Sequence, residues 1–217
     1  MYTPNTVPTK GIQRFKTDLK IEVFSDEQIR QIIKYFYRMR NKDKTLYSYR
    51  NVIMVWLLLG TGARLAELVR LRWRDIDFEH ETISLFGKNR TAMNLPIARK
   101  LKKELTEYRV FIDYHFKQCL PDYVLTDMQG KPLNENAVKC VFKRAKTVLN
   151  FEDVRLSAHT FRHTFAHRCI MAGMDIYTLQ KMMRHSDLGM VQRYLALWGT
   201  ALKEQNDKFN PLNTLNL

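Results

Sequence analysis

The sequence predicts a mainly helical domain that carries one small antiparallel β-sheet, an α+β class. Apolar residues recur at helical spacing through most of the 217 residues, and one early stretch alternates as paired strands do. No regular alternation of strands and helices indicates a parallel sheet. Hydrophobic residues make up 45% of the chain, enough for a sizeable core, and the length suits one compact domain with short arms.

The first elements follow from local signals. Residues 1–20 predict a basic arm, because prolines and a glycine punctuate them. A helix should begin after Ser25, whose side chain can cap it, and Gln28 three residues on completes a capping box. The apolar face of that helix would consist of Ile29, Ile32, Ile33 and Phe36.

A second helix over 47–59 is almost wholly apolar, so we expect it to be buried. It should end at the Gly-Thr-Gly of 60–62, and a third, short helix follows. Residues 82–86 alternate between apolar and polar side chains, as does the stretch that ends at 95–97. With a Gly-Lys-Asn-Arg turn at 87–90 between them, these stretches predict a β-hairpin.

The rest of the chain is predicted to be helical apart from one strand. The expected elements are a helix over 98–119, a strand at 123–125, a helix from the cap Asn134 to 149, and helices over 158–172, 176–184 and 190–198. We therefore expect an arm (1–20), a single domain (21–198) and a polar tail (199–217).

The charge balance favours a polyanionic partner. Thirty-six Lys and Arg against 22 Asp and Glu give a net charge of +14, which suits DNA, RNA or an anionic membrane surface and also a merely basic protein. The N-terminus has no apolar signal-peptide core, and the most apolar run, Val52 to Leu59, is too short to span a bilayer. We therefore expect no membrane association.

The cysteine pattern predicts a reducing, cytoplasmic setting. The count is odd and includes no CxxC pair, which argues against a disulfide framework. Each cysteine stands in an apolar helical pattern and is interpreted as a small core residue. The three are Cys119, Cys140 and Cys169.

Five short segments concentrate residue types suited to a phosphodiester. Taken singly each is a weak signal, because an isolated Arg is usually a surface charge or a salt-bridge partner and an isolated Lys in a turn is common. The segments are Thr61-Gly-Ala-Arg64-Leu-Ala-Glu67-Leu68, Gly87-Lys88-Asn-Arg90, His159-Thr-Phe-Arg162-His163, Arg184-His185-Ser-Asp187 and Arg193-Tyr194-Leu195.

In this order the segments resemble the tyrosine recombinase (phage integrase) family. They are similar to its Thr-Gly-x-Arg-x-x-Glu-Leu box, its Gly-Lys hairpin turn, its His-x-x-Arg box, and a His followed nine residues later by a Tyr. The spacings of 24 residues from Arg64 to Lys88 and 26 from His159 to His185 resemble its Xer-like members. The resemblance covers about 22–198 and implies the catalytic-domain fold of that family.

The chemistry of strand cleavage explains the residue types. Attack on a phosphodiester adds negative charge to the non-bridging oxygens, which planar guanidiniums such as those of Arg64 and Arg162 can hold without a metal ion. We expect both arginines to stand on helices. A tyrosine phenol with a pKa near 10 needs a base, and His159 can take its proton.

The resemblance implies a role for each position. Tyr194 would be the nucleophile, Lys88 would protonate the leaving 5′-oxygen, His185 would hydrogen-bond the phosphate, and Glu67 would orient a basic or His partner. The implied reaction is two transesterifications through a 3′-phosphotyrosine, which needs neither cofactor nor ATP. The residues expected to contact DNA are Arg64, Lys88, Arg90, Arg162 and Arg184.

One position departs from the family pattern. The family usually has Leu-Gly-His before its second histidine, whereas this chain has Met183-Arg184-His185. An arginine in place of glycine near the scissile phosphate either adds a phosphate contact, which is our interpretation, or crowds the site. Replacing Arg184 with Gly and measuring cleavage distinguishes the two.

Other interpretations of the same residues stay open. His159, His163 and His167 share one helix face and two of them suit zinc, but a complete ligand set is missing. We therefore expect no metal site, and we expect His163 to pack and to form internal hydrogen bonds. Tyr177 is the nearest competitor of Tyr194 as nucleophile. Among functions, the alternatives are a type IB topoisomerase or telomere resolvase, a DNA-binding protein without catalysis, and an RNA-binding protein.

The resemblance also implies partners. Double-stranded DNA is the expected substrate, bound by a homotetramer assembled on two DNA sites. Family members usually carry an N-terminal core-binding domain, of which this chain shows only the arm, so we expect weaker DNA binding by the chain alone. The tail 199–217 is expected to pass to a neighbouring protomer or, in the free protein, to fold back onto its own chain, with Leu202, Phe209 and Leu212 as its apolar anchors.

Overall fold

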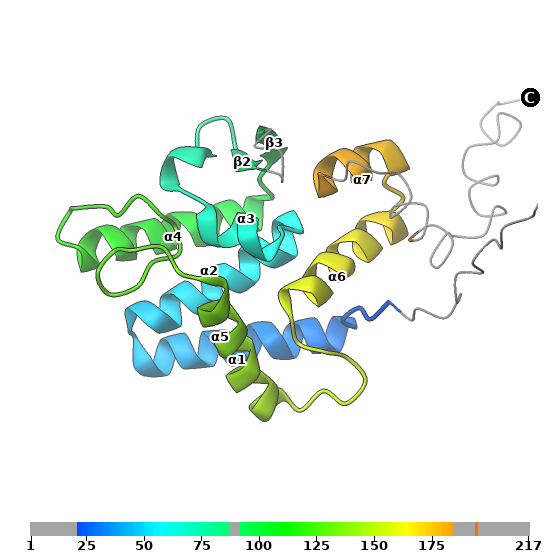
Figure 1. Ribbon diagram of the computed structural model, residues 1–217, viewed down its shortest axis with the longest axis horizontal. Helices are drawn as coiled ribbons and strands as arrows, with labels where there is room; N and C mark the ends of the chain where they lie inside the picture. Colours follow the sequence, from blue (N-terminus) through cyan, green and yellow to red (C-terminus); the bar gives the residue numbers. More distant parts are fainter. Residues whose placement is uncertain (1–20, 87–91, 185–193, 195–217) are drawn as a thin grey trace, which may run out of the picture.

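The computed structural model describes residues 21–86, 92–184 and Tyr194, and this part is mainly helical (Figure 1). The helices are α1 (Asp26–Asp43), α2 (Leu46–Thr61), α3 (Leu65–Arg70), the 3-10 turn η1 (Trp73–Asp75), α4 (Arg99–His115), α5 (Glu135–Leu149), α6 (Ala158–Met171) and α7 (Ile176–Met183). The strands are β1 (Ile76–Asp77), β2 (Thr82–Phe86) and β3 (Ala92–Pro96). The predicted α+β class is confirmed.

Local capping sets the starts of α1 and α5. The Ser25 hydroxyl accepts from the backbone N–H of Gln28, and the Gln28 side chain accepts in return from the backbone N–H of Ser25, which is the predicted capping box. Asn134 caps α5 by accepting from the N–H of Ala137 at 2.8 Å. These starts were predictable because each depends on residues only three positions apart.

The helix α2 is the centre of the main core. Most of its residues are buried, and it contacts α1, α4 and α6, as its place near the middle of Figure 1 shows. Its almost wholly apolar sequence therefore matches its surroundings on several sides. The amphipathic α1 instead buries one face: Ile32 and Phe36 are buried, and Ile29 and Ile33 pack against the core from the edge.

The sheet has the strand order β1-β2-β3 and is antiparallel throughout. Ile83 pairs with Leu95, and both side chains are buried, as is Leu85 two residues along β2. This alternation places one face of the sheet on the core and confirms the predicted hairpin. The turn at 87–91 lies outside the described residues.

Two predicted elements are wrong in extent. The helix expected over 98–119 ends at His115, because Lys117 and Gln118 take left-handed backbone conformations, with φ of 54° and 64°, that stop a right-handed helix. The strand expected at 123–125 is absent from the described chain. Tyr123 instead makes an isolated bridge with Arg72, and Thr126, just after the segment, makes one with Pro132.

Two of the three cysteines are not the core residues that the sequence predicts, whereas Cys169 packs against an apolar cluster. Cys119 and Cys140 are exposed and Cys169 is half-buried, and burial raises the pKa of the Cys169 thiol to about 11. Cys119 is exposed because it lies beyond the end of α4, and Cys140 because it stands on the outward side of α5.

None of the described helices has the length and apolarity required to cross a bilayer.

A second, smaller apolar cluster lies between α6 and α7 and contains Tyr194. Phe165 and Ile170 enter it from α6, and Leu179 and Met183 enter it from α7. Tyr194 is only 1% exposed. The cluster therefore brings the C-terminal tyrosine against the helix that carries His159 and Arg162.

Gly62 holds the junction between α2 and this second cluster. It ends α2 with a left-handed φ of 57°, and a Cβ built on it would lie 2.5 Å from Cδ1 of Phe165.

We expect Gly62→Ala to lower the free energy of unfolding by about 2–4 kcal/mol, because the new side chain adds left-handed backbone strain and overpacking. Urea denaturation measures the loss. Gly130→Ala is the control: Gly130 has a similar φ of 75°, but a Cβ built on it would lie 3.4 Å from Cβ of Pro121, an ordinary contact distance. Its substitution should therefore lower the free energy of unfolding by only about 1 kcal/mol. Equal losses would contradict the steric argument.

Candidate active site

The turn between α2 and α3 presents Arg64. The Thr61 hydroxyl donates to the carbonyl of Leu57 at 2.6 Å and accepts from the N–H of Ala63 at 3.2 Å, which fixes the turn. Arg64 stands just before α3, not within a helix as expected. Glu67 fixes it instead: its carboxylate accepts from the Arg64 backbone N–H at 2.8 Å and from Nη1 at 2.7 Å.

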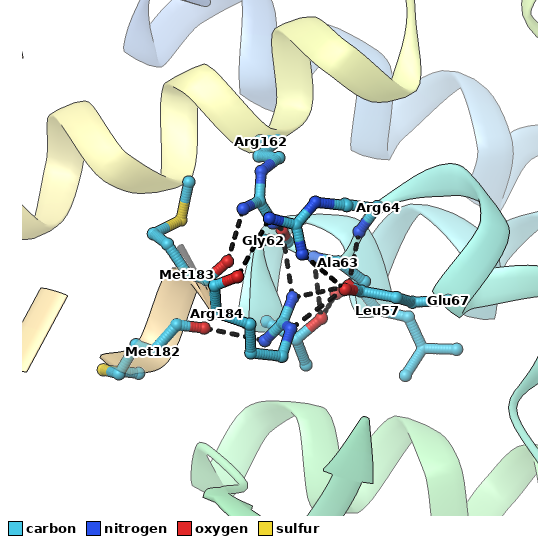
Figure 2. A network of polar contacts seen from close by, with 10 residues as sticks. Leu57, Gly62, Ala63, Arg64, Glu67, Arg162, Met182, Met183 and Arg184 are labelled. Carbon is cyan, nitrogen blue, oxygen red and sulfur yellow. Dashed lines mark hydrogen bonds and ion pairs between the residues drawn. The ribbon is translucent and has the colours of Figure 1, made fainter. Parts of the chain in front are cut away.

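Arg162 lies at the base of the same site. Its residue is 4% exposed, and its Nη1 donates to the carbonyl of Gly62 at 2.6 Å. Its Nη2 donates to the carbonyl of Met183 at the end of α7. One guanidinium from α6 therefore joins the α2–α3 turn to α7, and Figure 2 shows it beside the guanidinium of Arg64.

Arg184 is the third guanidinium of the site. Its Nε and Nη2 donate to Oε2 of Glu67 at 3.2 and 2.7 Å, and its Nη1 donates to the carbonyl of Met182 at 2.7 Å. Its side chain is 4% exposed. Its own carbonyl accepts from Nη2 of Arg64 at 3.0 Å. The sequence interpretation gave Arg184 a phosphate contact, whereas in this structure the guanidinium is buried against Glu67 (Figure 2).

The net charge of the cluster formed by Arg64, Glu67, Arg162 and Arg184 is positive. Burial alone would raise the pKa of the Glu67 carboxyl, but hydrogen bonds and charge from Arg184 and Arg64 outweigh it and lower that pKa. Burial, together with the charges of Arg64 and Arg184, lowers the pKa of Arg162 to about 9, which leaves it cationic at pH 7. Three guanidiniums around one carboxylate make a site with a net charge of +2, suited to an anion.

Tyr194 contacts α6 through His163. The Tyr194 hydroxyl lies 2.8 Å from Nδ1 of His163, and the rings of His159 and His163 meet edge to face with centroids 4.1 Å apart. Burial raises the pKa of Tyr194, while the charges of Arg162 and Arg64 act in the opposite direction. Burial outweighs these charges, so the pKa of the phenol stays above its ordinary value.

The sequence interpretation did not identify His163 as the neighbour of the phenol. The expected base was His159, and His163 was expected to pack and to form internal hydrogen bonds without a named partner. In the structure the ring next to the hydroxyl is that of His163. The spacing of four residues from His159 was the available signal, since it places both rings on one face of α6. Burial and then the charge of Arg162 lower the pKa of His159.

A family model described as the phage integrase family matches residues 22–198. The chain belongs to the phage integrase family. It is 27% identical over 196 residues to the tyrosine recombinase XerC of Pediococcus pentosaceus, an alignment that covers 88% of this chain and 63% of that protein. The resemblance to tyrosine recombinases is thereby confirmed.

Solved structures show the same fold. The catalytic domain of bacteriophage HP1 integrase matches with a TM-score of 0.63 and 22% identity over 89% of this chain and 97% of that one. The XerH site-specific recombinase, in a post-cleavage complex with its palindromic difH substrate, matches with a TM-score of 0.69 and 18% identity over 86% of this chain and 53% of that one. The chain spans less than two thirds of the length of the curated relatives that it matches, 63% and 56% for two of them.

Three positions assigned from the phage integrase pattern, Lys88, Arg90 and His185, lie outside the described residues, and their roles stay predictions. Others that the structure describes meet in one place: Arg64 from the α2–α3 turn, Glu67 from α3, His159 and Arg162 from α6, and Tyr194. The competitor Tyr177 is 64% exposed on α7. Within the described part of the chain, no group of three or more His, Cys, Asp or Glu side chains could hold a metal ion.

Proposed function

We propose that this chain is the catalytic domain, residues 21–198, of a site-specific DNA recombinase that cleaves and rejoins strands through a 3′-phosphotyrosine at Tyr194. The observation that carries the proposal is that the Tyr194 hydroxyl lies 2.8 Å from Nδ1 of His163, on the same helix α6 that carries Arg162. A nucleophile and two phosphate-binding cations in one site are what a transesterification requires. The similarity to proteins named tyrosine recombinases supports recombination over the topoisomerase and resolvase alternatives.

The proposed reaction is balanced by residues of the chain. The Tyr194 oxygen bonds to phosphorus, its proton passes to the histidine pair of His163 and His159, and the bond to the 5′-oxygen breaks. Arg64 and Arg162 hold the charge that develops on the non-bridging oxygens. Lys88 protonates the 5′-oxygen, and His185 hydrogen-bonds the phosphate. In the second step a 5′-hydroxyl from the partner strand attacks phosphorus and gives its proton to Lys88, while the bond to the Tyr194 oxygen breaks and the phenol recovers its proton from the histidine pair. The energy of the bond is thus kept, and no step uses ATP or a metal.

Double-stranded DNA is the proposed partner. The net charge of +14 favours it, and a structural neighbour, the Tn1549 transposon integrase, is described in complex with transposon right end DNA. We propose that the chain acts as a homotetramer on two DNA sites in the cytoplasm and exchanges its tail 199–217 between protomers. The tail lies outside the described residues, so its deletion is the test: unchanged cooperativity on a two-site substrate would contradict the exchange.

A covalent-trapping assay tests the proposed chemistry. The substrate is a pool of nicked DNA duplexes that has been enriched for binding to this chain. Cleavage of such a duplex releases a short fragment, so the strand cannot be rejoined and the enzyme stays covalently bound to the DNA. We expect a denaturation-resistant adduct whose modified peptide, identified by mass spectrometry, contains Tyr194. DNA that is saturated with protein and yields no adduct would support the non-catalytic DNA-binding alternative.

The pH dependence of cleavage tests the base. The pKa of His159 lies below 6.5 because burial and Arg162 disfavour its charged form, so the ring is neutral and able to accept a proton at pH 7. Single-turnover adduct formation should therefore be flat between pH 7 and 8 and fall only below pH 6.5. This range also stays below the pKa of about 9 of Arg162. His159→Gln should lose the acidic fall, and the exposed His80→Gln should keep it. A loss of rate between pH 8 and 7 would contradict the assignment.

A further inference from the structure

The backbone conformation at Arg184 is one that disfavours any residue with a Cβ. Arg184 ends α7 with φ 52° and ψ 42°, in the left-handed region where glycine is least strained and where the family usually places glycine. A side chain with a Cβ is strained there, so its contacts must compensate. The contacts of Arg184 are all inside the site: Glu67, the carbonyl of Met182 and, at 3.5 Å, the carbonyl of Gly62.

The buried ion pair with Glu67 separates Arg184 from a direct phosphate ligand, because it already balances the charge of Arg184. Arg162, which is equally buried, donates instead to the carbonyls of Gly62 and Met183. The side chains of Arg184 and Glu67 are each 4% exposed, whereas that of Arg64 is 36% exposed. Arg64 is thus the member of this trio that DNA can reach. Its guanidinium is oriented by two acceptors, Oε1 of Glu67 at 2.7 Å and the carbonyl of Arg184 at 3.0 Å.

The charges show what Arg184 adds. Without it, the Glu67 carboxylate would have Arg64 as its ion-pair partner, and that pairing would offset the charge that a phosphate needs. With Arg184 on Oε2, the carboxylate is balanced from the buried side and still accepts from Arg64 on Oε1. Arg64 and Arg162 then keep a net charge of +2 for an anion.

We propose that Arg184 is a positioning residue that holds and neutralises Glu67, so that the Arg64 guanidinium stays oriented and keeps its charge for the scissile phosphate. The proposal rests on the proposed recombinase function for the identity of that phosphate. Arg184 touches no reacting atom in this arrangement and acts through Glu67 and Arg64.

The decisive comparison is Arg184→Gly against the double variant Arg184→Gly/Glu67→Gln. Glycine suits the left-handed backbone and keeps the carbonyl that Arg64 uses, so the backbone itself is not disturbed. Arg184→Gly leaves Glu67 to offset Arg64, and we expect single-turnover adduct formation on the nicked substrate to fall about tenfold, as for loss of a supporting residue. Removing the carboxylate charge as well restores +2, and we expect the double variant to be about threefold faster than Arg184→Gly.

A purely structural role predicts the opposite order, because a second lost contact would slow the enzyme further. Melting temperatures of all variants show whether each is folded at the assay temperature, and Arg184→Lys, which keeps the charge, should recover part of the rate. An unchanged rate for Arg184→Gly, or a double variant slower than the single one, would overturn the proposal.

A second measurement does not depend on catalysis. Inorganic phosphate is titrated into protein labelled with ¹⁵N-arginine, and the side-chain signal of Arg64, assigned with Arg64→Lys, is followed. We expect apparent phosphate affinity to fall severalfold in Arg184→Gly and to recover in the double variant. If the wild-type protein forms no covalent adduct but the phosphate affinities of the variants follow this order, the recombinase function is refuted and the positioning role of Arg184 still holds. An active wild type in which neither measurement responds to Arg184→Gly would refute only the positioning role.

Discussion

Tyr194→Phe should abolish the covalent adduct, with a fall in adduct formation beyond about 10⁴-fold, because phenylalanine has no oxygen to bond to phosphorus. DNA binding should persist, since the arginines of the site are untouched. The lost hydrogen bond to His163 should cost about 1 kcal/mol of stability. The adduct is measured on denaturing gels with the nicked substrate, and DNA binding by native gel shift of the same samples.

Tyr177→Phe is the matched control. Tyr177 is 64% exposed on α7, whereas Tyr194 is 1% exposed beside His163, so only one of the two is near the cationic site. The control should form adduct at the wild-type rate. An adduct in Tyr194→Phe, or its loss in Tyr177→Phe, would move the nucleophile to another tyrosine.

The burial of Tyr194 bears on how the reaction begins. A duplex cannot reach a hydroxyl on a residue that is 1% exposed and packed among Phe165, Leu179 and Met183. Cleavage therefore requires the phenol to leave this cluster or the cluster to open. In the structure as it stands, His163 holds the hydroxyl at 2.8 Å, so its contact belongs to the state before DNA is cut.

Elements defined by local interactions were predictable from the sequence. The cap at Ser25 and the apolar run of α2 each depend on neighbours within a few residues, and both predictions hold. The end of α4 was not predictable, because two non-glycine residues, Lys117 and Gln118, adopt left-handed conformations that no turn residue announces. The two-residue β1 was also missed, since it exists only through its pairing with β2.

The candidate site shows the same division. The family pattern identified Arg64, Arg162 and Tyr194 by residue type and spacing, and the structure brings these residues to one place. The direction of a side chain depends on the tertiary packing around it. Arg184 faces Glu67 because the end of α7 meets the α2–α3 turn, two segments more than 110 residues apart. No spacing within the sequence carries that information.

Arg162→Lys should give the second-largest loss, about 10²–10³-fold in single-turnover adduct formation. A lysine keeps one positive charge but replaces the planar fork that donates to the carbonyls of Gly62 and Met183. The lysine variant would therefore lose the bidentate hydrogen bonding that a guanidinium can offer to phosphate. It would also lose the hydrogen bonds that connect the α2–α3 turn to α7. We expect a lower melting temperature as well, because the buried carbonyls lose their donors.

Arg168→Lys, on the same helix, is the control that distinguishes a loss of catalysis from a loss of stability. Arg168 is 40% exposed and pairs with Asp26 at 2.6 Å, on a different side of α6 from the site. It should keep the wild-type rate of adduct formation. The Arg162→Lys rate is compared below its own melting temperature and at protein concentrations that saturate the DNA, so that neither unfolding nor weak binding enters the ratio. A rate within threefold of wild type under these conditions would mean that Arg162 serves the fold and that another cation carries the phosphate.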